Sequence, residues 1–525
     1  MRDAILGHYP ARLSTGSHVT RADAYSRSMT SLWQLTAPVI PSDEFDGRRC
    51  DAAVVGAGLT GLVVAVLLAR AGQRVTLLEA RTTGAVTTGG TTGKLSLLQG
   101  TVLGELRERA GEETLHAYVE ANREGQAWLM RELESRGERL ELRDAYTYAS
   151  SEDQLALLER ELEAAVSAGV PVRQTDEAGL PFETFGALRL DRQAQLQPMV
   201  VLARLAEELR ERGGRLVEGC RVRDVEHEDH ALRLVTSKGS IAAGICVLAT
   251  GTPILDRGMF FAKLQPSRSF VTAYRLRETE PPRGMYVSAG KPSRSLRTAT
   301  GADGREVLVV GGGSRPLGSS DDTRERIREL DEWTAQRFAD PRRVNWWAAQ
   351  DYRTHSRVPF AGAMPRGGGR IYTATGYNKW GMTNAVAAGL ALASEVLGGS
   401  MEWARTLRDR SVKLTEIADA LGANASVAAR LVSGWAAAEL TPIEGIGELG
   451  EGEGVVARDG VEPIAVSCVD GAVCRVSGVC THLGGILRWN SAERSWDCPL
   501  HGSRFAADGT LLEGPAVRDL PRREP

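Results

Sequence analysis

The sequence predicts an α/β protein that ends in a small all-β domain. Two observations carry this prediction. A glycine-rich turn joins a buried strand to a helix near Gly56, and strand and helix patterns alternate from there to about residue 400. From about Ile443 onward only short strand and turn signals follow, which is typical of a small all-β domain.

Length and composition fit this division. A chain of 525 residues suits two or three domains, and 42% hydrophobic with 25% charged residues is ordinary for a globular protein. A net charge of −3 favours neither nucleic acid nor an anionic membrane as a partner. The first 45 residues lack the pattern of a secretory signal, and the seven cysteines form no disulfide framework. We therefore expect a cytoplasmic protein.

The first folded element is predicted to bind a dinucleotide. Asp51–Gly61 has the pattern of a buried strand, a glycine turn and the start of a helix, and the next strand ends in Glu79. Gly56 permits the tight turn, Gly58 lets the backbone approach a pyrophosphate, and Gly61 lets helix and strand pack closely. An acid placed like Glu79 binds the ribose hydroxyls. The unit is therefore Rossmann-like.

The same region raises one alternative. Ala52–Ala69 is uncharged and mostly apolar, and its length approaches that of a transmembrane helix. The three glycines within it match the nucleotide-binding pattern, which a buried strand and helix explain better. We therefore expect no membrane span.

Three further segments favour FAD over NAD. Cys246–Gly251 is a buried strand that ends in Ala-Thr-Gly, and Thr87–Ser96 is rich in threonine and glycine and is placed to wrap the flavin ring. Ile371–Thr383 precedes a helix of small residues over Asn384–Leu397, whose first amides suit the electron-rich end of a flavin. Each segment alone is compatible with ordinary turn chemistry. The expected FAD contacts are Gly56, Gly58, Leu59, Thr60, Gly61, Glu79, Ala80, Arg81, Thr91, Thr92, Lys94, Val222, Thr250, Gly251, Gly376, Trp380, Gly381, Met382 and Thr383.

Two pairs of metal ligands mark the C-terminal domain. Cys480-Thr-His482 is followed after fifteen residues by Cys498-Pro-Leu-His501. This pattern matches Rieske sites, in which two cysteines hold one iron of a [2Fe–2S] cluster and two histidines hold the other. The alternative is a zinc site of two Cys and two His, although zinc sites prefer Cys-x2-Cys or His-x3–5-His pairs.

Four neighbouring positions refine the expected cluster. Many respiratory Rieske domains carry a disulfide at the positions that match Gly485 and Leu500, so that staple is absent here. Ser503 keeps a hydroxyl that can donate to a cluster sulfur, whereas Phe505 replaces the tyrosine of high-potential members. Hydrogen bonds to the sulfurs stabilise the reduced cluster. We therefore predict a potential in the lower to middle part of the range of about −150 to +300 mV.

From about Ser31 to Gly399 the chain resembles the glycine/D-amino-acid oxidase (DAO) superfamily of FAD enzymes. The motifs that carry the resemblance are Trp347–Tyr352, Pro359–Gly362 and Leu264–Arg268, and Gly90–Lys94 is similar to a bacterial subgroup fused to a Rieske domain. The resemblance implies a discontinuous Rossmann-like FAD-binding domain with an inserted α+β substrate domain. The expected limits are an N-terminal arm at 1–48, the FAD-binding domain at 49–100, 194–265 and 350–400, the substrate domain at 101–193 and 266–349, a helical linker at 401–442 and the Rieske domain at 443–525.

A reductase that draws electrons from NADH would need a second nucleotide-binding unit. Val309–Gly313 is a further glycine-rich candidate, but turn residues follow it rather than a helix. We expect a glycine-rich loop that ends a strand of the substrate domain. A substrate-oxidising flavoprotein is therefore favoured over a pyridine-nucleotide reductase.

The resemblance implies oxidation of a carbon–nitrogen bond in an amine or amino acid by hydride transfer to FAD. Electrons would then pass singly through the Rieske cluster to an external acceptor, either a protein or a quinone. Two rival functions stay open: the cluster receives electrons from a ferredoxin-type donor while FAD performs a reduction or oxygenation, or the chain is a non-catalytic redox carrier. Candidate catalytic residues, each of which can also be an ordinary hydrogen-bonded side chain, are His355, Tyr352, Arg353, Arg315 and Lys263.

Overall fold

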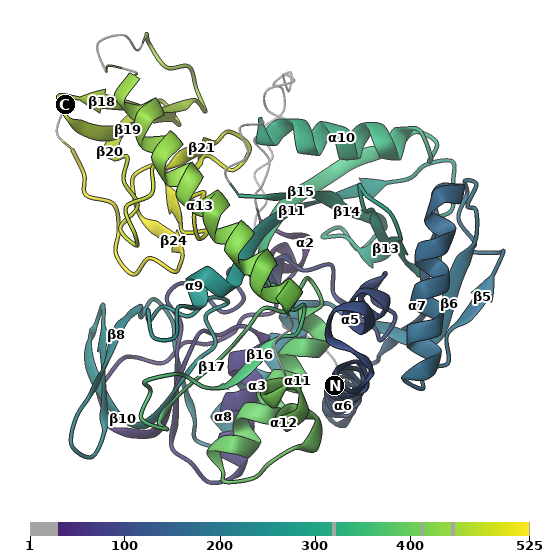
Figure 1. The fold of residues 1–525 in the computed structure, drawn as a ribbon, viewed down its shortest axis with the longest axis horizontal. Helices are drawn as coiled ribbons and strands as arrows, with labels where there is room; N and C mark the ends of the chain where they lie inside the picture. The colour runs from purple at the N-terminus through teal and green to yellow at the C-terminus, as the bar shows by residue number, and fades with distance from the viewer. Residues whose placement is uncertain (1–29, 318–321, 411–413, 441, 443–446, 524–525) are drawn as a thin grey trace, which may run out of the picture.

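The computed structural model describes residues 30–317, 322–410, 414–440, 442 and 447–523, and Figure 1 shows their arrangement. Residues 1–29 of the expected N-terminal arm lie outside the described residues. Two large sheets form the main body, and a small β domain lies against one end of the second sheet (Figure 1).

The first sheet has eight strands, in the order β16-β17-β10-β1-β2-β7 with β8 and β9 continuing beside β10. Its central pairs, β17–β10–β1–β2–β7, are parallel. A parallel sheet is covered on both faces, so its strands are apolar throughout. The strands are β1 (Cys50–Val55), β2 (Val75–Leu78), β7 (Arg215–Val217), β8 (Val222–His227), β9 (Leu232–Thr236), β10 (Gly239–Leu248), β16 (Phe360–Ala363) and β17 (Ile371–Thr375).

Both faces of this sheet are buried in separate cores. Ala52 and Val54 of β1 join the core formed with the helices, whereas Ala53 and Val55 join the core formed with β8 and β9. The alternation follows from the two-residue period of a strand. The covering helices are α3 (Leu59–Arg70), α8 (Pro198–Glu211) and α11 (Gly381–Val396).

The second sheet has nine strands and lies against the first through α4 (Thr87–Gly90) and β15. Its outer helices are α5 (Val102–Ala110), α6 (Glu112–Ser135), α7 (Leu155–Ser167) and α10 (Thr323–Ala335). The strands are β3 (Lys94–Leu95), β4 (Glu141–Tyr148), β5 (Arg173–Thr175), β6 (Ala187–Gln195), β11 (Leu264–Arg275), β12 (Met285–Ser288), β13 (Ser295–Thr300), β14 (Glu306–Pro316) and β15 (Arg342–Thr354). Short elements complete this part: α2 (Leu32–Leu35), a 3-10 turn (Glu152–Gln154) and α9 (Phe260–Lys263).

The glycine run in Val309–Gly313 differs from its expected role. It does not end a strand, because β14 continues through it to Pro316 and pairs with β11 on both sides of an irregularity at Gly313 and Ser314. Glycine is needed here for packing. A Cβ at Gly312 would lie 3.0 Å from both the Leu330 and the Arg294 side chains. The expected loop is therefore a strand interior on which α10 packs closely.

Two helices, α12 (Glu402–Asp409) and α13 (Leu414–Leu440), lead to the C-terminal domain. Figure 1 shows α13 running from the main body across the face of that domain. None of the helices in the described part of the chain is both long and apolar enough to cross a lipid bilayer.

The C-terminal domain consists of two small antiparallel sheets around a compact apolar core. Trp496 and Phe505 are fully buried in it, and Trp489 packs on Trp496 with ring centres 4.7 Å apart. The strands are β18 (Gly454–Asp459), β19 (Glu462–Val469) and β20 (Ala472–Ser477) in one sheet, and β21 (Arg488–Asn490), β22 (Ser495–Asp497), β23 (Arg504–Ala506) and β24 (Leu511–Glu513) in the other.

Candidate functional site

The nucleotide cradle begins where β1 passes into α3. Gly56 has a φ of +104°, and a Cβ there would lie 2.5 Å from the carbonyl oxygen of Ala249. A Cβ at Gly61 would lie 1.9 Å from the carbonyl oxygen of Gly56, so turn and helix can touch only when both residues are glycines. Gly58 precedes α3 and offers no capping side chain. The first amides of α3 are therefore suited to an anionic group.

Glu79 closes the cradle from the end of β2. Its Oε2 accepts a hydrogen bond from the backbone N–H of Ala57 at 2.8 Å, and its Oε1 accepts one from Arg81 at 2.8 Å. Burial raises the pKa of Glu79, whereas these two amides and the charges of Arg221 and Arg81 oppose the rise. The carboxylate is thus held beside the glycine turn, where an FAD ribose would offer two hydroxyls.

The start of β8 lies beside the end of β2. The backbone N–H of Cys220 donates to the Glu79 carbonyl at 2.8 Å, and that of Gly219 donates to the Arg81 carbonyl at 2.9 Å. Val222 follows at the first position of β8 and is buried. The end of β2, with Ala80 and Arg81, therefore lies next to the start of β8, with Val222.

Loops after β10 and β17 form the opposite half of the cradle. Gly251 has a φ of +78°, and a Cβ there would lie 3.4 Å from the ring of Tyr352. Gly376, with a φ of +83°, follows β17. The N-cap of α11 is Trp380, which makes no side-chain capping bond. The helix start at Gly381–Thr383 therefore offers amides to an electron-rich group.

Hydroxyl groups tie these loops to the helix start. Thr88 Oγ1 accepts a hydrogen bond from the Leu59 N–H at 3.2 Å, and Thr60 Oγ1 lies 2.7 Å from the Tyr377 hydroxyl. The Thr250 hydroxyl donates to a carbonyl of its own turn at 2.6 Å. The glycine turn, the two helix starts and the buried acid are the features that FAD requires, and the residues present fit this cofactor.

The threonine-rich segment follows the same wall into the second sheet. The carbonyl of Thr91 accepts a hydrogen bond from Trp33 Nε1 at 2.5 Å, and that of Thr92 accepts one from Arg297 Nη1 at 2.8 Å. Lys94 is buried, and its Nζ donates to the Tyr286 carbonyl at 2.8 Å. Burial lowers the pKa of Lys94 well below its ordinary value. The structure therefore places the Lys94 ammonium between β3 and β12.

Strand β15 separates two regions of the molecule, because its side chains alternate between the faces of the sheet. Gln350 and Tyr352 lie on the face that meets the Rieske domain. Gln350 Nε2 donates to the Tyr352 hydroxyl at 2.7 Å and to the Gly502 carbonyl at 2.8 Å. Burial raises the pKa of Tyr352. Asp351 and Arg353 occupy the opposite face of the strand.

Asp351 and Lys379 form a pair to which the sequence analysis assigned no role. The Lys379 backbone N–H donates to the Asp351 carboxylate. Burial raises the pKa of Asp351 to about 6. The Lys379 side chain is in contact with solvent, yet the surrounding protein removes part of its hydration and so lowers its pKa. The charge of Asp351 opposes this shift. Asn378 and Lys379 both have positive φ, at 48° and 68°, a strained conformation that non-glycine residues rarely adopt and that gathers at functional sites.

The remaining catalytic candidates lie in different places. Gln265 joins two of them: its Oε1 accepts a hydrogen bond from Arg353 Nε at 2.9 Å, and its Nε2 lies 3.5 Å from His355 Nδ1. The Lys263 ammonium is exposed and lies 5.3 Å from the centre of the Phe260 ring. Arg315 is exposed near the end of β14, opposite Arg268 in the strand register. His355 and Arg353 are thus brought together, whereas Lys263 and Arg315 point elsewhere.

The four expected cluster ligands converge from two loops. Cys480 and His482 lie between β20 and β21, and Cys498 and His501 lie between β22 and β23. The two thiols are close enough to interact, and the imidazole centres are 5.2 Å apart. Nδ1 of each histidine is buried without a hydrogen-bond partner. Buried nitrogens of this kind require a partner, and an iron ion satisfies them.

The geometry also distinguishes a cluster from a single ion. Within the described ranges, no three Cys, His, Asp or Glu side chains are grouped as ligands of one metal ion. A [2Fe–2S] cluster needs only two protein ligands on each iron, and the thiol pair and the imidazole pair supply them. A Cβ at Gly485 would lie 2.6 Å from Leu500 Cδ1, so the two positions of the missing staple are in contact. The residues present therefore fit the cluster.

The histidine edge of this site faces the body of the protein. The Phe261 ring lies 5.1 Å from the His501 ring and 5.8 Å from the His482 ring, measured between centres. Nε2 of His482 lies 3.2 Å from Asp256 Oδ1. The two imidazole side chains are almost completely buried. The edge from which an electron would leave or enter is therefore covered by the same chain.

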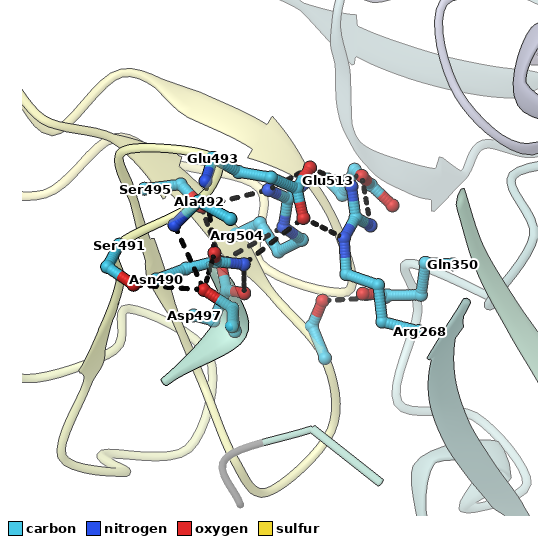
Figure 2. Close-up of polar contacts among 12 residues, drawn as sticks. Arg268, Gln350, Asn490, Ser491, Ala492, Glu493, Ser495, Asp497, Arg504 and Glu513 are labelled. Carbon is cyan, nitrogen blue, oxygen red and sulfur yellow. Dashed lines mark hydrogen bonds and ion pairs between the residues drawn. The ribbon is translucent and has the colours of Figure 1, made fainter. Parts of the chain in front are cut away.

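A buried network of charges holds the Rieske domain in this position (Figure 2). Arg268 of β11 forms ion pairs with Glu493 and with Glu513, the latter at 3.2 Å. Arg504 pairs with Glu493 at 3.0 Å, with Asp497 at 3.0 Å and with Glu513 at 2.7 Å. Charges this deeply buried are tolerated only when each has its partners. The docking of the two parts is therefore specific in geometry.

Known proteins agree with both parts of this description. The family model of FAD dependent oxidoreductases (DAO) matches residues 51–395, and the Rieske [2Fe-2S] domain model matches residues 440–523. A protein of Bacillus subtilis (strain 168), named as the Rieske 2Fe-2S iron-sulfur protein YhfW, is 29% identical over 506 residues, which cover 95% of this chain and 97% of that protein.

Two solved structures share the fold of the flavin part. Glycine oxidase from Geobacillus kaustophilus has a TM-score of 0.59 and 20% identity, and the match covers 70% of this chain and 99% of that one. L-proline dehydrogenase from P. horikoshii has a TM-score of 0.58 and 18% identity, with coverage of 70% and 100%.

These matches divide the chain where the structure divides it. The oxidoreductase model extends over the two large sheets, and the Rieske model extends over the C-terminal β domain with its Cys and His pairs. The match excludes the zinc site that the spacing had left as an alternative. The chain therefore belongs to the DAO family of FAD-dependent oxidoreductases and carries a C-terminal Rieske [2Fe–2S] domain.

Proposed function

We propose that the chain oxidises the carbon–nitrogen bond of an amino acid or a related amine, and that the electrons leave singly through the Rieske cluster to an external one-electron acceptor. The observation that carries the proposal is the set of charged groups beside the flavin end of the cradle, namely Asp351, Arg353 and Lys379. The chain shares its fold with glycine oxidase and L-proline dehydrogenase. The names of both proteins describe oxidation of an amino acid. The cytoplasmic location stays a prediction.

The charged groups suit a substrate that carries both signs. Arg353 is held by Gln265 and offers a guanidinium fork, and Lys379 adds an ammonium, so a substrate carboxylate would find two cations. Asp351 accepts the Lys379 backbone N–H. With a pKa of about 6, its carboxylate is ionised at neutral pH and can take a proton from the substrate ammonium.

The proposed reaction removes a hydride and a proton from the substrate. FAD supplies a two-electron acceptor for the hydride, and the cluster carries one electron at a time. The substrate ammonium would lose a proton to Asp351, and the carbon next to nitrogen would lose a hydride. The iminium that results would be hydrolysed by water to a carbonyl compound and ammonium. Arg353 and Lys379 hold the carboxylate, so that the reacting carbon keeps a fixed position.

Anaerobic mixing of the holoprotein with a panel of amino acids and amines tests the proposal. We expect loss of the flavin absorbance first and loss of the cluster absorbance after it, for at least one member of the panel. If reduced ferredoxin bleaches the cluster before the flavin and no amine bleaches the flavin, electrons enter through the cluster. If neither occurs, the chain is a redox carrier.

A further inference from the structure

A cleft lies between the nucleotide cradle and the Rieske domain. It has a volume of about 250 Å³. One wall is formed by residues at the ends of β2 and β8, including Ala80, Arg81 and Arg221. The other wall belongs to the Rieske domain and is formed within residues 510–519. The cleft therefore continues the cradle beyond Glu79.

The position of the cleft relative to Glu79 identifies its occupant. Ala80 and Arg81 follow Glu79 directly, and the charges of Glu79 and Asp519 both act on Arg221. An acid placed like Glu79 holds the ribose of the adenosine half of FAD. The adenine attached to that ribose must then extend beyond Glu79, in the direction of the cleft. A planar ring would find arginine side chains there on which it can stack.

The charges lining the cleft fit an anionic nucleotide. Arg81, Arg221, Arg223 and Arg518 line it, and Asp519 is the only carboxylate among its lining residues. Asp519 is itself engaged, because its Oδ1 accepts the Leu511 N–H at 2.8 Å. This excess of positive charge favours binding of the adenosine half of FAD, which is attached to the negatively charged pyrophosphate.

The Rieske wall of the cleft is also the support of the cluster. Arg221 Nη2 donates to the Leu511 carbonyl at 2.8 Å, which joins the wall to the cradle. From the same segment, the Ala516 N–H donates to Ser503 Oγ at 3.0 Å, and the Arg518 carbonyl accepts the Thr481 hydroxyl at 2.8 Å. Thr481 and Ser503 lie in the two ligand loops. One short segment therefore contacts the FAD-binding domain and both halves of the cluster site.

We propose that residues 510–519 of the Rieske domain form one wall of the adenosine site, so that FAD binding and docking of the cluster domain are thermodynamically linked. FAD then bridges the two domains and stabilises their docked arrangement. By linkage, docking stabilises bound FAD by the same factor. The inference rests on FAD occupying the cradle and does not depend on the proposed reaction, because no substrate takes part.

Hydrogen–deuterium exchange on the full chain tests the link directly. FAD-depleted and FAD-reconstituted protein are compared with the cluster intact, which its visible circular dichroism verifies. We expect FAD to slow exchange in residues 510–519 as well as at the glycine turn. The strands β18–β20, which lie in the same domain and line no part of the cleft, are the internal control and should exchange equally in both forms.

Matched arginine variants measure the contribution of one side chain. Arg518→Ala removes a guanidinium from the cleft, whereas Arg522→Ala removes an exposed arginine that pairs with Asp508 in the same domain. We expect Arg518→Ala to raise the dissociation constant of FAD about threefold to tenfold, measured by the fluorescence of released flavin, and Arg522→Ala to leave it unchanged. Absence of protection in 510–519, or equal FAD affinity in the two variants, would overturn the proposal. Weak FAD binding by the unaltered full chain would also overturn the proposal, because it would show that the cradle does not hold FAD.

Discussion

The nucleotide cradle and the docking interface of the Rieske domain are held together by different forces. The cradle depends on backbone: Gly56 and Gly61 are in contact at a distance that admits no Cβ at Gly61, and the N-cap residues of α3 and α11 make no side-chain capping bond. The docking interface depends on side chains: Arg268 and Arg504 share two buried carboxylates, Glu493 and Glu513. A cradle of backbone amides is local in the chain, whereas an ion network can join residues from distant segments. The two regions should therefore respond differently to substitution.

Loss of a cluster ligand should separate the two regions most completely. We expect Cys498→Ser to abolish the cluster while the flavin remains bound, because no residue of the glycine turn contacts Cys498. Absorbance and electron paramagnetic resonance spectra measure both centres in one sample. Cys474→Ser is the matched control, since this thiol is partly exposed and free, and it should keep the cluster. A Cys498→Ser protein with a full cluster signal would contradict the ligand assignment.

Removal of the shared arginine should break the docking interface. Arg268→Met leaves Glu493 and Glu513 with less compensation in a buried site, and breaking such a pair costs about 3–5 kcal/mol. We expect the cluster domain to unfold or undock at a lower denaturant concentration than the flavin domain. The separate signals of the flavin and the cluster measure the two transitions. Arg315→Met, opposite in the strand register and exposed, should have little effect. Equal destabilisation by both variants would show that the network does not control docking.

The Asp351 carboxylate offers a functional test of the flavin side alone. Asp351→Asn removes the proposed proton acceptor, and we expect kcat/KM to fall about 10²- to 10⁴-fold with the cluster unaffected. Because Asp351 must be ionised to accept a proton and burial raises its pKa to about 6, activity of the unaltered protein should fall as pH drops through about 6. The variant should lose this limb of the pH profile.

Asp331→Asn provides the control for that experiment. Asp331 is a partly buried carboxylate of α10. It accepts hydrogen bonds from Tyr274 and Arg343, and it lies away from the face of β15 that carries Asp351. Its replacement should leave the acidic limb in place. Retention of the limb in Asp351→Asn would assign the titration to another group.

A single hydroxyl in the cluster domain should have the smallest effect. Phe505 is fully buried close to the ligand loops, and Phe505→Tyr adds a donor that can stabilise the reduced cluster. We expect the potential to rise by a few tens of millivolts, the equivalent of one ordinary hydrogen bond in a one-electron couple. A redox titration followed by electron paramagnetic resonance measures it, with Phe505→Leu as the apolar control. A lower potential in the tyrosine variant would contradict the predicted role of position 505.

Much of the cradle was predictable because its requirements are local. Gly56, Gly58, Gly61 and Glu79 occur within one strand–helix–strand unit, and their spacing follows from backbone geometry alone. The Cys480–His482 and Cys498–His501 pairs were predictable for a similar reason, since each pair sits in one loop. Lys379 had no such signal, because its importance depends on positive φ values and on Asp351 in another element.

The glycine run at Gly311–Gly313 shows where local pattern misled. Glycines followed by turn residues favour a loop, yet β14 continues because β11 pairs with it on both sides of Gly313 and Ser314, and Leu330 of α10 packs closely on Gly312. Tertiary pairing thus overrode the local preference. The same limit applies to Arg268 and Glu493, which are separated by 225 positions in the chain.

The two cofactors, FAD and a [2Fe–2S] cluster, were predictable from the chain alone, because dinucleotide turns and cluster loops are short units whose residue types and spacing follow from covalent geometry and ligand chemistry. How the two regions face each other depends on tertiary contacts: the histidine edge lies under Phe261, Gln350 reaches the Gly502 carbonyl, and part of residues 510–519 lines a cleft with Ala80 and Arg81. These contacts join segments far apart in the chain. Their energies come from burial and pairing of charges, which depend on three-dimensional neighbours and leave no fixed spacing in the sequence.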